Sequence, residues 1–122
     1  MQSATLKGRS ILVVEDEPLI TLDISRELEA AGAAVTSTNT LQHALLLVEH
    51  DGLSGAILDH GLGDCDTSLV CKRLTERGIP YILYTGFPFV DGCCSGAPHM
   101  VKPAGDGELV AALARLIGDQ EA

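Results

Sequence analysis

The sequence predicts an α/β domain in which helices cover both faces of a parallel sheet. Short apolar runs of strand length alternate with segments of helical periodicity along nearly the whole chain. Acidic, hydroxyl or basic residues directly follow four of these runs. Such alternation is typical of right-handed crossovers and a doubly wound sheet. The 122 residues suffice for one domain with a substantial core. We therefore expect a single domain over residues 1–122, with its core over about 9–118.

The first strand and helix are expected in residues 10–32. Residues 10–14 are largely apolar, and Pro18 suits the first turn of a helix, where its missing N–H costs nothing. Gly32 would stop this helix. Its inward residues, at helical spacing, would be Ile20, Ile24, Leu28 and Ala31.

A second strand over 33–37 should precede a second helix that ends at His50. Asn39 or Thr40 would cap this helix. Its inward residues would be Leu41, Ala44, Leu45 and Val48. Asp51-Gly52 then turns the chain into a third strand that ends at Asp59.

The remaining helices and strands are expected to alternate in the same way. Asp66 or Thr67 would cap a third helix that carries Leu69, Val70 and Leu74 and ends near Gly78. Strands are expected over 79–84 and 99–101. The last helix has an apolar stripe formed by Leu109, Ala112, Leu113, Leu116 and Ile117.

Residues 86–98 interrupt this pattern where a fourth helix should follow the fourth strand. Three glycines and two prolines in this segment disfavour helix. We expect a fourth helix that is short, with at most one or two turns around 89–94, or disordered.

The composition argues against several classes of partner. Eight basic residues against 17 acidic ones give a net charge of −9, which opposes contact with nucleic acid or an anionic membrane. No apolar run is long enough to cross a bilayer, and residues 1–5 lack the apolar core of a secretory signal. We therefore expect a cytoplasmic protein. Its cysteines form no Cys-x-x-Cys pair, and reduced thiols are the expected state.

The polar residues that end the strands suggest a phosphoryl-transfer site. Asp59 ends the third strand, Glu15-Asp16 follow the first, and Thr85 and Lys102 follow the last two. In a parallel sheet these ends share one edge, where ligands bind. Three carboxylates together repel one another unless a cation joins them, and Mg²⁺ suits few oxygen ligands together with phosphate. Lys102 and Thr85 could hold a phosphoryl group, with Asp59 as nucleophile.

The chain resembles a response-regulator receiver domain of two-component signalling, in the superfamily of CheY-like proteins. The motifs that carry the resemblance occur in the family's order and spacing: residues 12–18, Leu58-Asp59, residues 84–86 and Lys102-Pro103. The resemblance implies a flavodoxin-like receiver fold with a five-stranded parallel sheet in the order 2-1-3-4-5. It implies a phosphoacceptor domain rather than an enzyme acting on other substrates.

Roles for individual residues follow from the resemblance. Asp59 would be the phosphoacceptor, and Mg²⁺ would bind Asp16, Asp59 and the main-chain carbonyl of Gly61, with Glu15 acting through water. Thr85 and Lys102 would hold the phosphoryl oxygens. The Lys102-Pro103 peptide is often cis in the family.

The resemblance also implies partners. The phosphoryl donor would be a phosphohistidine on a sensor histidine kinase or a histidine phosphotransfer protein. With no output domain expected, the signal would pass through contact with an unknown downstream protein, or the domain would serve as a phosphate sink.

Three departures from the family pattern concern the first acid, the switch aromatic and the segment after Thr85, which lacks a good helix. The first acid is Glu15, where Asp is also common. His99 stands where the family has a switch aromatic. Thr85-Gly86-Phe87 partly resembles an alphaproteobacterial subgroup with a Phe-Ala-Thr-Gly signature, although Leu83 and Tyr84 replace its first two residues. We hypothesise that phosphorylation orders residues 86–98, anchored at Thr85 and held by Phe87 and Phe89.

Several alternatives compete with a phosphorylated receiver domain. A degenerate receiver that signals by protein contact without phosphorylation is the first rival. A haloacid-dehalogenase-type phosphatase would need Asp-x-Asp at its nucleophile, but the chain has Asp59-His60-Gly61. A flavodoxin would need a phosphate loop rich in Ser and Thr where Glu15-Asp16-Glu17 stand. His43, His50 and His60 are expected to face solvent, and Cys65 and Cys71 to be spacers or core residues.

Overall fold

The computed structural model describes residues 6–58, 66–85, 99–101, 105 and 107–121. Five strands form one sheet: β1 (Ser10–Val14), β2 (Ala34–Thr38), β3 (Gly55–Leu58), β4 (Tyr81–Thr85) and β5 (His99–Val101). Four helices lie in the described residues: α1 (Pro18–Ala30), α2 (Leu41–Leu47), α3 (Asp66–Glu76) and α4 (Glu108–Glu121). Within this part of the chain no helix has the length and apolar character needed to cross a membrane.

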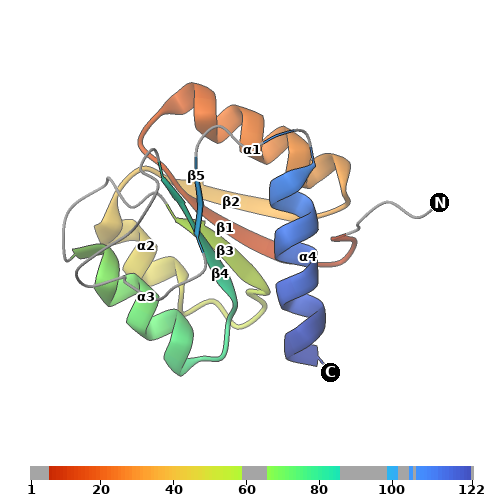
Figure 1. The fold of residues 1–122 in the computed structure, drawn as a ribbon. Coiled ribbons are helices and arrows are strands. Elements are labelled where there is room, and N and C mark those ends of the chain that lie inside the picture. Colours follow the sequence, from red (N-terminus) through yellow and green to blue (C-terminus); the bar gives the residue numbers. More distant parts are fainter. Residues whose placement is uncertain (1–5, 59–65, 86–98, 102–104, 106, 122) are drawn as a thin grey trace.

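The sheet is parallel throughout, and its strand order is β2-β1-β3-β4-β5 (Figure 1). This is the predicted α/β doubly wound architecture with five strands in the order 2-1-3-4-5. Because every strand runs in the same direction, the carboxyl ends of all five strands lie at one edge of the sheet.

Helices cover both faces of the sheet (Figure 1). On one face, α1 and α4 enclose a core that includes Ile24, Leu28, Leu113 and Ile117. On the other face, α2 and α3 enclose a second core. Alternate residues of β1 and β3 contribute to the two cores, because successive side chains of a strand point to opposite faces.

The expected α1 and α4 are confirmed in detail. Pro18 is the first residue of α1, and Gly32 follows its end with φ +98°, a conformation that glycine adopts without strain. The apolar stripe predicted for α4 packs on the sheet, with Leu109, Leu113 and Ile117 buried.

The predicted bounds of α2 and its flanking strand need small corrections. β2 covers 34–38 rather than 33–37. Thr40 caps α2, and its hydroxyl accepts a hydrogen bond from the His43 N–H at 3.2 Å. The helix does not extend through His50, because the N–H groups of Glu49 and His50 turn to carbonyls three residues back and end the regular helix.

The predicted bounds and inward face of α3 also need correction. α3 already begins at Asp66, so the expectation that Asp66 or Thr67 would precede the helix as its cap is wrong by at least one residue. Val70 and Leu74 are buried as expected, and Cys71 packs beside them as a core residue. Leu69, by contrast, is 52% exposed.

Strand β4 begins at Tyr81, two residues later than expected. The Ile79 N–H bonds back to the Leu74 carbonyl, and Pro80 has no N–H to offer a neighbouring strand. The predicted short or disordered helix over 86–98 lies outside the described residues.

Candidate functional site

The acidic pair Glu15-Asp16 lies at the carboxyl edge of the sheet, immediately after β1. The Glu15 N–H donates to the Thr38 carbonyl at 3.0 Å, which extends the pairing with β2 by one residue. Pro18 then starts α1, so only Glu17 separates the acidic pair from the first turn of the helix. The chain is therefore held on both sides of the pair.

Glu15 is a buried carboxylate with a defined structural role. Its side chain is 3% exposed, and Oε2 accepts a hydrogen bond from the Glu17 N–H at 3.1 Å. Its main-chain carbonyl accepts from the Thr21 hydroxyl at 3.5 Å. Glu15 thus ties the end of β1 to the beginning of α1. A carboxylate engaged in this way fits the expected outer position, where it would act on a cation through water rather than directly.

Asp16 lies beside Glu15 but is exposed. Its carboxylate is accessible from solvent, as a direct ligand for a hydrated cation must be. The two neighbouring acids therefore differ in burial. The difference agrees with the predicted roles, in which Asp16 contacts a cation directly and Glu15 contacts it through water.

A cleft of about 560 Å³ opens beside the acidic pair, between the start of α1 and the loop from β2 to α2. Six of its ten lining residues carry hydroxyl, amide or imidazole groups. The lining residues are Glu15, Asp16, Pro18, Thr21, Leu22, Ser25, Ser37, Thr38, Asn39 and His43. His43 is exposed, as expected from the sequence. The signal that could have placed it here is the topology, since β2 ends at the same edge as β1.

Strand register aligns the described ends of β1, β3 and β4 at this edge. Val14 pairs with Leu58, and Leu58 pairs with Leu83, so Asp59 directly follows the strand residue that neighbours Val14. Thr85 is the last residue of β4 and pairs with Val101, the residue before Lys102. The chain thus approaches one region from four adjacent strands.

Much of the predicted site lies outside the described residues. This applies to Asp59, Gly61, Phe87, Lys102 and Pro103. The backbones of Thr85 and His99 belong to β4 and β5. Within the described part of the chain, no three His, Cys, Asp or Glu side chains form a metal-binding group. The assignment of roles to these positions therefore remains a prediction.

Sequence comparison identifies a curated relative of the chain. No protein-family model matches the chain. The transcriptional regulatory protein TcrA of Mycobacterium tuberculosis is 32% identical over 118 residues, which cover 91% of this chain. The chain spans about half the length of this curated relative, 47%.

Solved structures give a consistent result for the fold. The receiver domain of a sensor histidine kinase from Pseudomonas aeruginosa PAO1, whose active-site cleft coordinates a magnesium ion, has a TM-score of 0.79 and 26% identity, covering 91% of this chain and 98% of that one. The response regulator PhyR from Brucella abortus has a TM-score of 0.80 and 26% identity, covering 97% of this chain and 51% of that one. A receiver domain protein from Methanospirillum hungatei, at 23% identity and a TM-score of 0.79, shares the fold.

Proposed function

By fold and by sequence likeness the chain is a response-regulator receiver domain, and on that premise we propose that it accepts a phosphoryl group on Asp59. The observation that carries the proposal is the convergence of four strand ends. Glu15 and Asp16 follow β1, Asp59 follows β3 in the sequence, Thr85 ends β4, and Lys102 follows β5. This set contains a nucleophile, the carboxylates for a cation and two groups for phosphoryl oxygens.

In the proposed reaction a carboxylate oxygen of Asp59 forms a bond to phosphorus. The bond between phosphorus and an imidazole nitrogen of the donor breaks, and its electron pair stays on the imidazole. Lys102 and Thr85 hold the equatorial oxygens and favour the charge distribution of the transition state. The donor is a phosphohistidine of a sensor kinase or of a phosphotransfer protein.

The two acids that follow β1, Glu15 and Asp16, suit a magnesium ion. Exposed Asp16 offers a direct oxygen ligand, while buried Glu15 is held by the Glu17 N–H and would contact a metal-bound water. Asp59 and the Gly61 carbonyl would complete the protein ligands. The cation would neutralise the clustered carboxylates and the incoming phosphate. The magnesium ion in the Pseudomonas receiver domain supports this choice of metal.

We further propose that the domain passes its signal by contact with a downstream protein or acts as a phosphate sink. Phosphorylation would act on Thr85, on residues 86–98 including Phe87, and on His99, which replaces the family's switch aromatic. Resemblance to the subgroup with the Phe-Ala-Thr-Gly signature stays a prediction, as do the cytoplasmic location and the absence of enzymatic activity on other substrates.

Incubation with acetyl phosphate and Mg²⁺, followed by intact mass measurement, tests the assignment of Asp59. The wild-type protein should gain the mass of one phosphoryl group, and Asp59→Asn should gain none. Asp64→Asn, which changes a nearby acid outside the motif, is the matched control and should behave like the wild type. Phosphorylation of Asp59→Asn at the wild-type rate would refute the site. A wild-type protein that is never phosphorylated would favour the degenerate receiver.

A further inference from the structure

Two surfaces of the described structure expose large apolar side chains. On α1, Leu19 is 74% and Leu22 is 45% exposed. On the helices of the opposite face, Leu46 of α2 is 69% and Leu69 of α3 is 52% exposed. Exposed leucines that occur singly are ordinary, but a contiguous apolar surface indicates a contact with another molecule.

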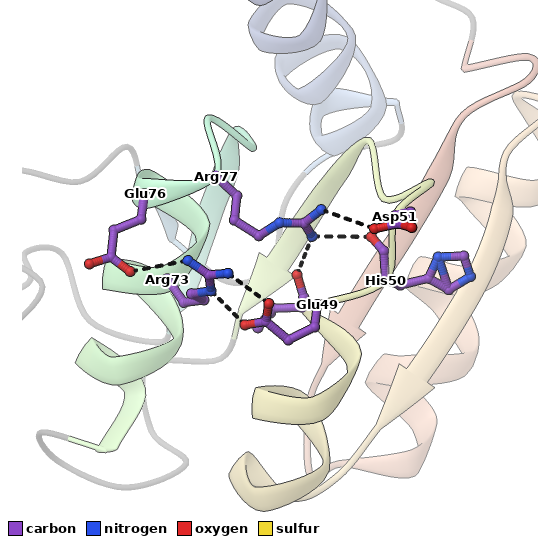
Figure 2. A network of polar contacts seen from close by, with 7 residues as sticks. Glu49, His50, Asp51, Arg73, Glu76 and Arg77 are labelled. Carbon is purple, nitrogen blue, oxygen red and sulfur yellow. Dashed lines mark hydrogen bonds and ion pairs between the residues drawn. The ribbon is translucent and has the colours of Figure 1, made fainter.

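Leu46 and Leu69 lie on the same side of the α2–α3 pair. Glu49 and Arg73 contact each other across the two helices (Figure 2). Leu46 precedes Glu49 by three residues, across the tight turn that ends α2, and Leu69 precedes Arg73 by four residues within α3. Each leucine therefore lies about one turn before its ion-pair neighbour. Each of the two helices connects two strands of the same parallel sheet, so α2 and α3 run in the same direction. Leu46 and Leu69 are therefore both exposed about one turn before the contact that joins the two segments.

Polar contacts hold the two helices in a fixed relation beside these leucines. Arg73 donates to both carboxylate oxygens of Glu49, at 2.5 Å and 2.8 Å, and reaches Glu76 at 3.5 Å. Arg77 donates to the carbonyls of Val48 and His50 at the end of α2 (Figure 2). A bidentate pair with further bonds gives a defined geometry rather than a mobile surface contact. The apolar surface is thus largely formed before any partner binds.

Charge distinguishes this surface from the one on α1. Residues 15–32, which contain Leu19 and Leu22, carry six acidic residues and one basic residue. Residues 41–54 and 66–77 carry four acidic residues and three of the chain's eight basic ones. In a chain of net charge −9, the α2–α3 surface is therefore nearly neutral and of mixed sign. A second copy would be repelled at α1 but could approach here with opposite charges facing each other.

We propose that the α2–α3 surface, defined by Leu46, Leu69 and the Glu49–Arg73 pair, is a self-association surface that binds a second copy of this chain. In a two-fold contact the leucines of both copies pack together, and the mixed charges at the rim pair across the axis. The contact is small, so the dimer is weak and depends on concentration. It does not require phosphorylation of Asp59, and its test is independent of that site.

Sedimentation velocity of the unphosphorylated protein tests the proposal, from about 10 µM to about 1 mM, a range that covers weak association. The wild type should sediment faster as concentration rises. Leu46→Gln/Leu69→Gln should weaken the association constant at least about tenfold, since the buried apolar surface is lost. Gln forms helices well, so the fold should persist, and circular dichroism checks this. Leu46→Met/Leu69→Met keeps the surface apolar and should still associate.

Leu19→Gln/Leu22→Gln is the matched control, because it removes two exposed leucines from the acidic surface of α1. This variant should associate like the wild type. In NMR spectra, concentration-dependent amide shifts should map to residues 41–54 and 66–77. The proposal is overturned if the wild type remains monomeric up to about 1 mM. It is equally overturned if the α1 variant, rather than the α2–α3 variant, loses association.

Discussion

Glu15 and Asp16 are chemically similar neighbours that the fold places in different environments. Burial and the bond from the Glu17 N–H give Glu15 a part in holding β1 to α1. Asp16, one residue further, is exposed. A charged group that is hydrogen-bonded and buried is costly to remove, whereas an exposed acid among other acids contributes repulsion. Substitution of the two should therefore have opposite effects on stability and unequal effects on metal binding.

Calorimetric titration with Mg²⁺ should separate the two acids. We expect Asp16→Ala to lose metal binding almost entirely, because it removes a proposed direct ligand. Glu15→Gln should weaken binding less, since it alters a contact made through water and keeps an acceptor for the Glu17 N–H. In urea denaturation Glu15→Ala should cost about 1–3 kcal/mol, because it removes a buried side chain and its charge-assisted hydrogen bond from the Glu17 N–H. If Glu15→Gln lost more metal affinity than Asp16→Ala, the proposed roles would have to be exchanged.

Among the elements, the connection from α1 to β2 depends on a single glycine. Gly32 has φ +98°, and a Cβ placed there would lie 2.9 Å from the Cα of Lys7. Gly32→Ala thus combines backbone strain with a clash against main chain. We expect it to lower the free energy of unfolding by about 1–3 kcal/mol in urea denaturation.

The matched control for this prediction is Gly118→Ala. Gly118 lies within α4, is exposed, and has no atom within 4 Å of the place where a Cβ would stand. Alanine should therefore stabilise the protein, by up to about 0.5–1 kcal/mol. Opposite signs for the two variants are expected. A neutral or stabilising Gly32→Ala would contradict the described packing of the N-terminal segment on this turn.

The contact between α2 and α3 should make stability depend on acid. The hydrogen bonds from Arg73 hold the pKa of Glu49 below its ordinary value of 4.5, while the carboxylate raises the pKa of Arg73. A depressed pKa means that the stabilisation is present above 4.5 and is lost as pH falls through the lower, folded-state pKa. The effect is small, because both side chains are near half exposed.

Urea midpoints between about pH 6 and about pH 3 test this linkage. Below 4.5 the wild type should lose more stability than Glu49→Gln, which cannot titrate at this position. Glu76→Gln serves as the control, since the contact of Glu76 with Arg73, at 3.5 Å, is longer than those of Glu49. Glu76→Gln should retain most of the wild-type slope of urea midpoint against pH. Identical slopes for the wild type and Glu49→Gln would show that the pair does not contribute.

Local patterns were enough to predict the elements, but contacts between distant segments were not readable from the sequence. Pro18 and Gly32 predicted the limits of α1, and a regular stripe predicted the inward face of α4. The Leu6 N–H, however, bonds to the Ala31 carbonyl at 2.8 Å, and Leu6 is buried, although no periodic segment surrounds it. The inward face of α3 includes Cys71 rather than Leu69, since the helix's orientation is set by the core against which it packs.

Some features of the candidate site could likewise be predicted from the sequence, and others could not. Topology follows from alternating strands and helices, so the shared edge at which the strands end could be predicted from the sequence. The presence of Asp59 and Lys102 at that edge stays a prediction. The burial difference between Glu15 and Asp16 could not be predicted, because it depends on the Glu17 N–H and the start of α1. The cleft beside them also required the structure, since β2 and α2 contribute residues such as Ser37 and His43 that belong to no motif.

For the molecule as a whole, the dominant electrostatic fact is a net charge of −9, with Glu15 and Asp16 adjacent to each other directly after β1. Self-repulsion of like charges destabilises the compact state, and a bound cation both relieves it and adds its own binding free energy. Stability should therefore rise with Mg²⁺ more than with the same ionic strength of NaCl. The difference between the two salts measures specific binding rather than screening.

Thermal unfolding of the wild type and Asp16→Ala, across a Mg²⁺ series with NaCl at matched ionic strength, provides the last prediction. Without Mg²⁺, Asp16→Ala should melt higher, because one repelling carboxylate is gone. At Mg²⁺ about ten times the dissociation constant, the wild type gains about 1.4 kcal/mol, or roughly 5 °C for a domain of this size. The variant should gain only what NaCl gives, so the two melting curves should converge or cross as Mg²⁺ rises. Equal gains for both proteins would mean that Asp16 is not a metal ligand.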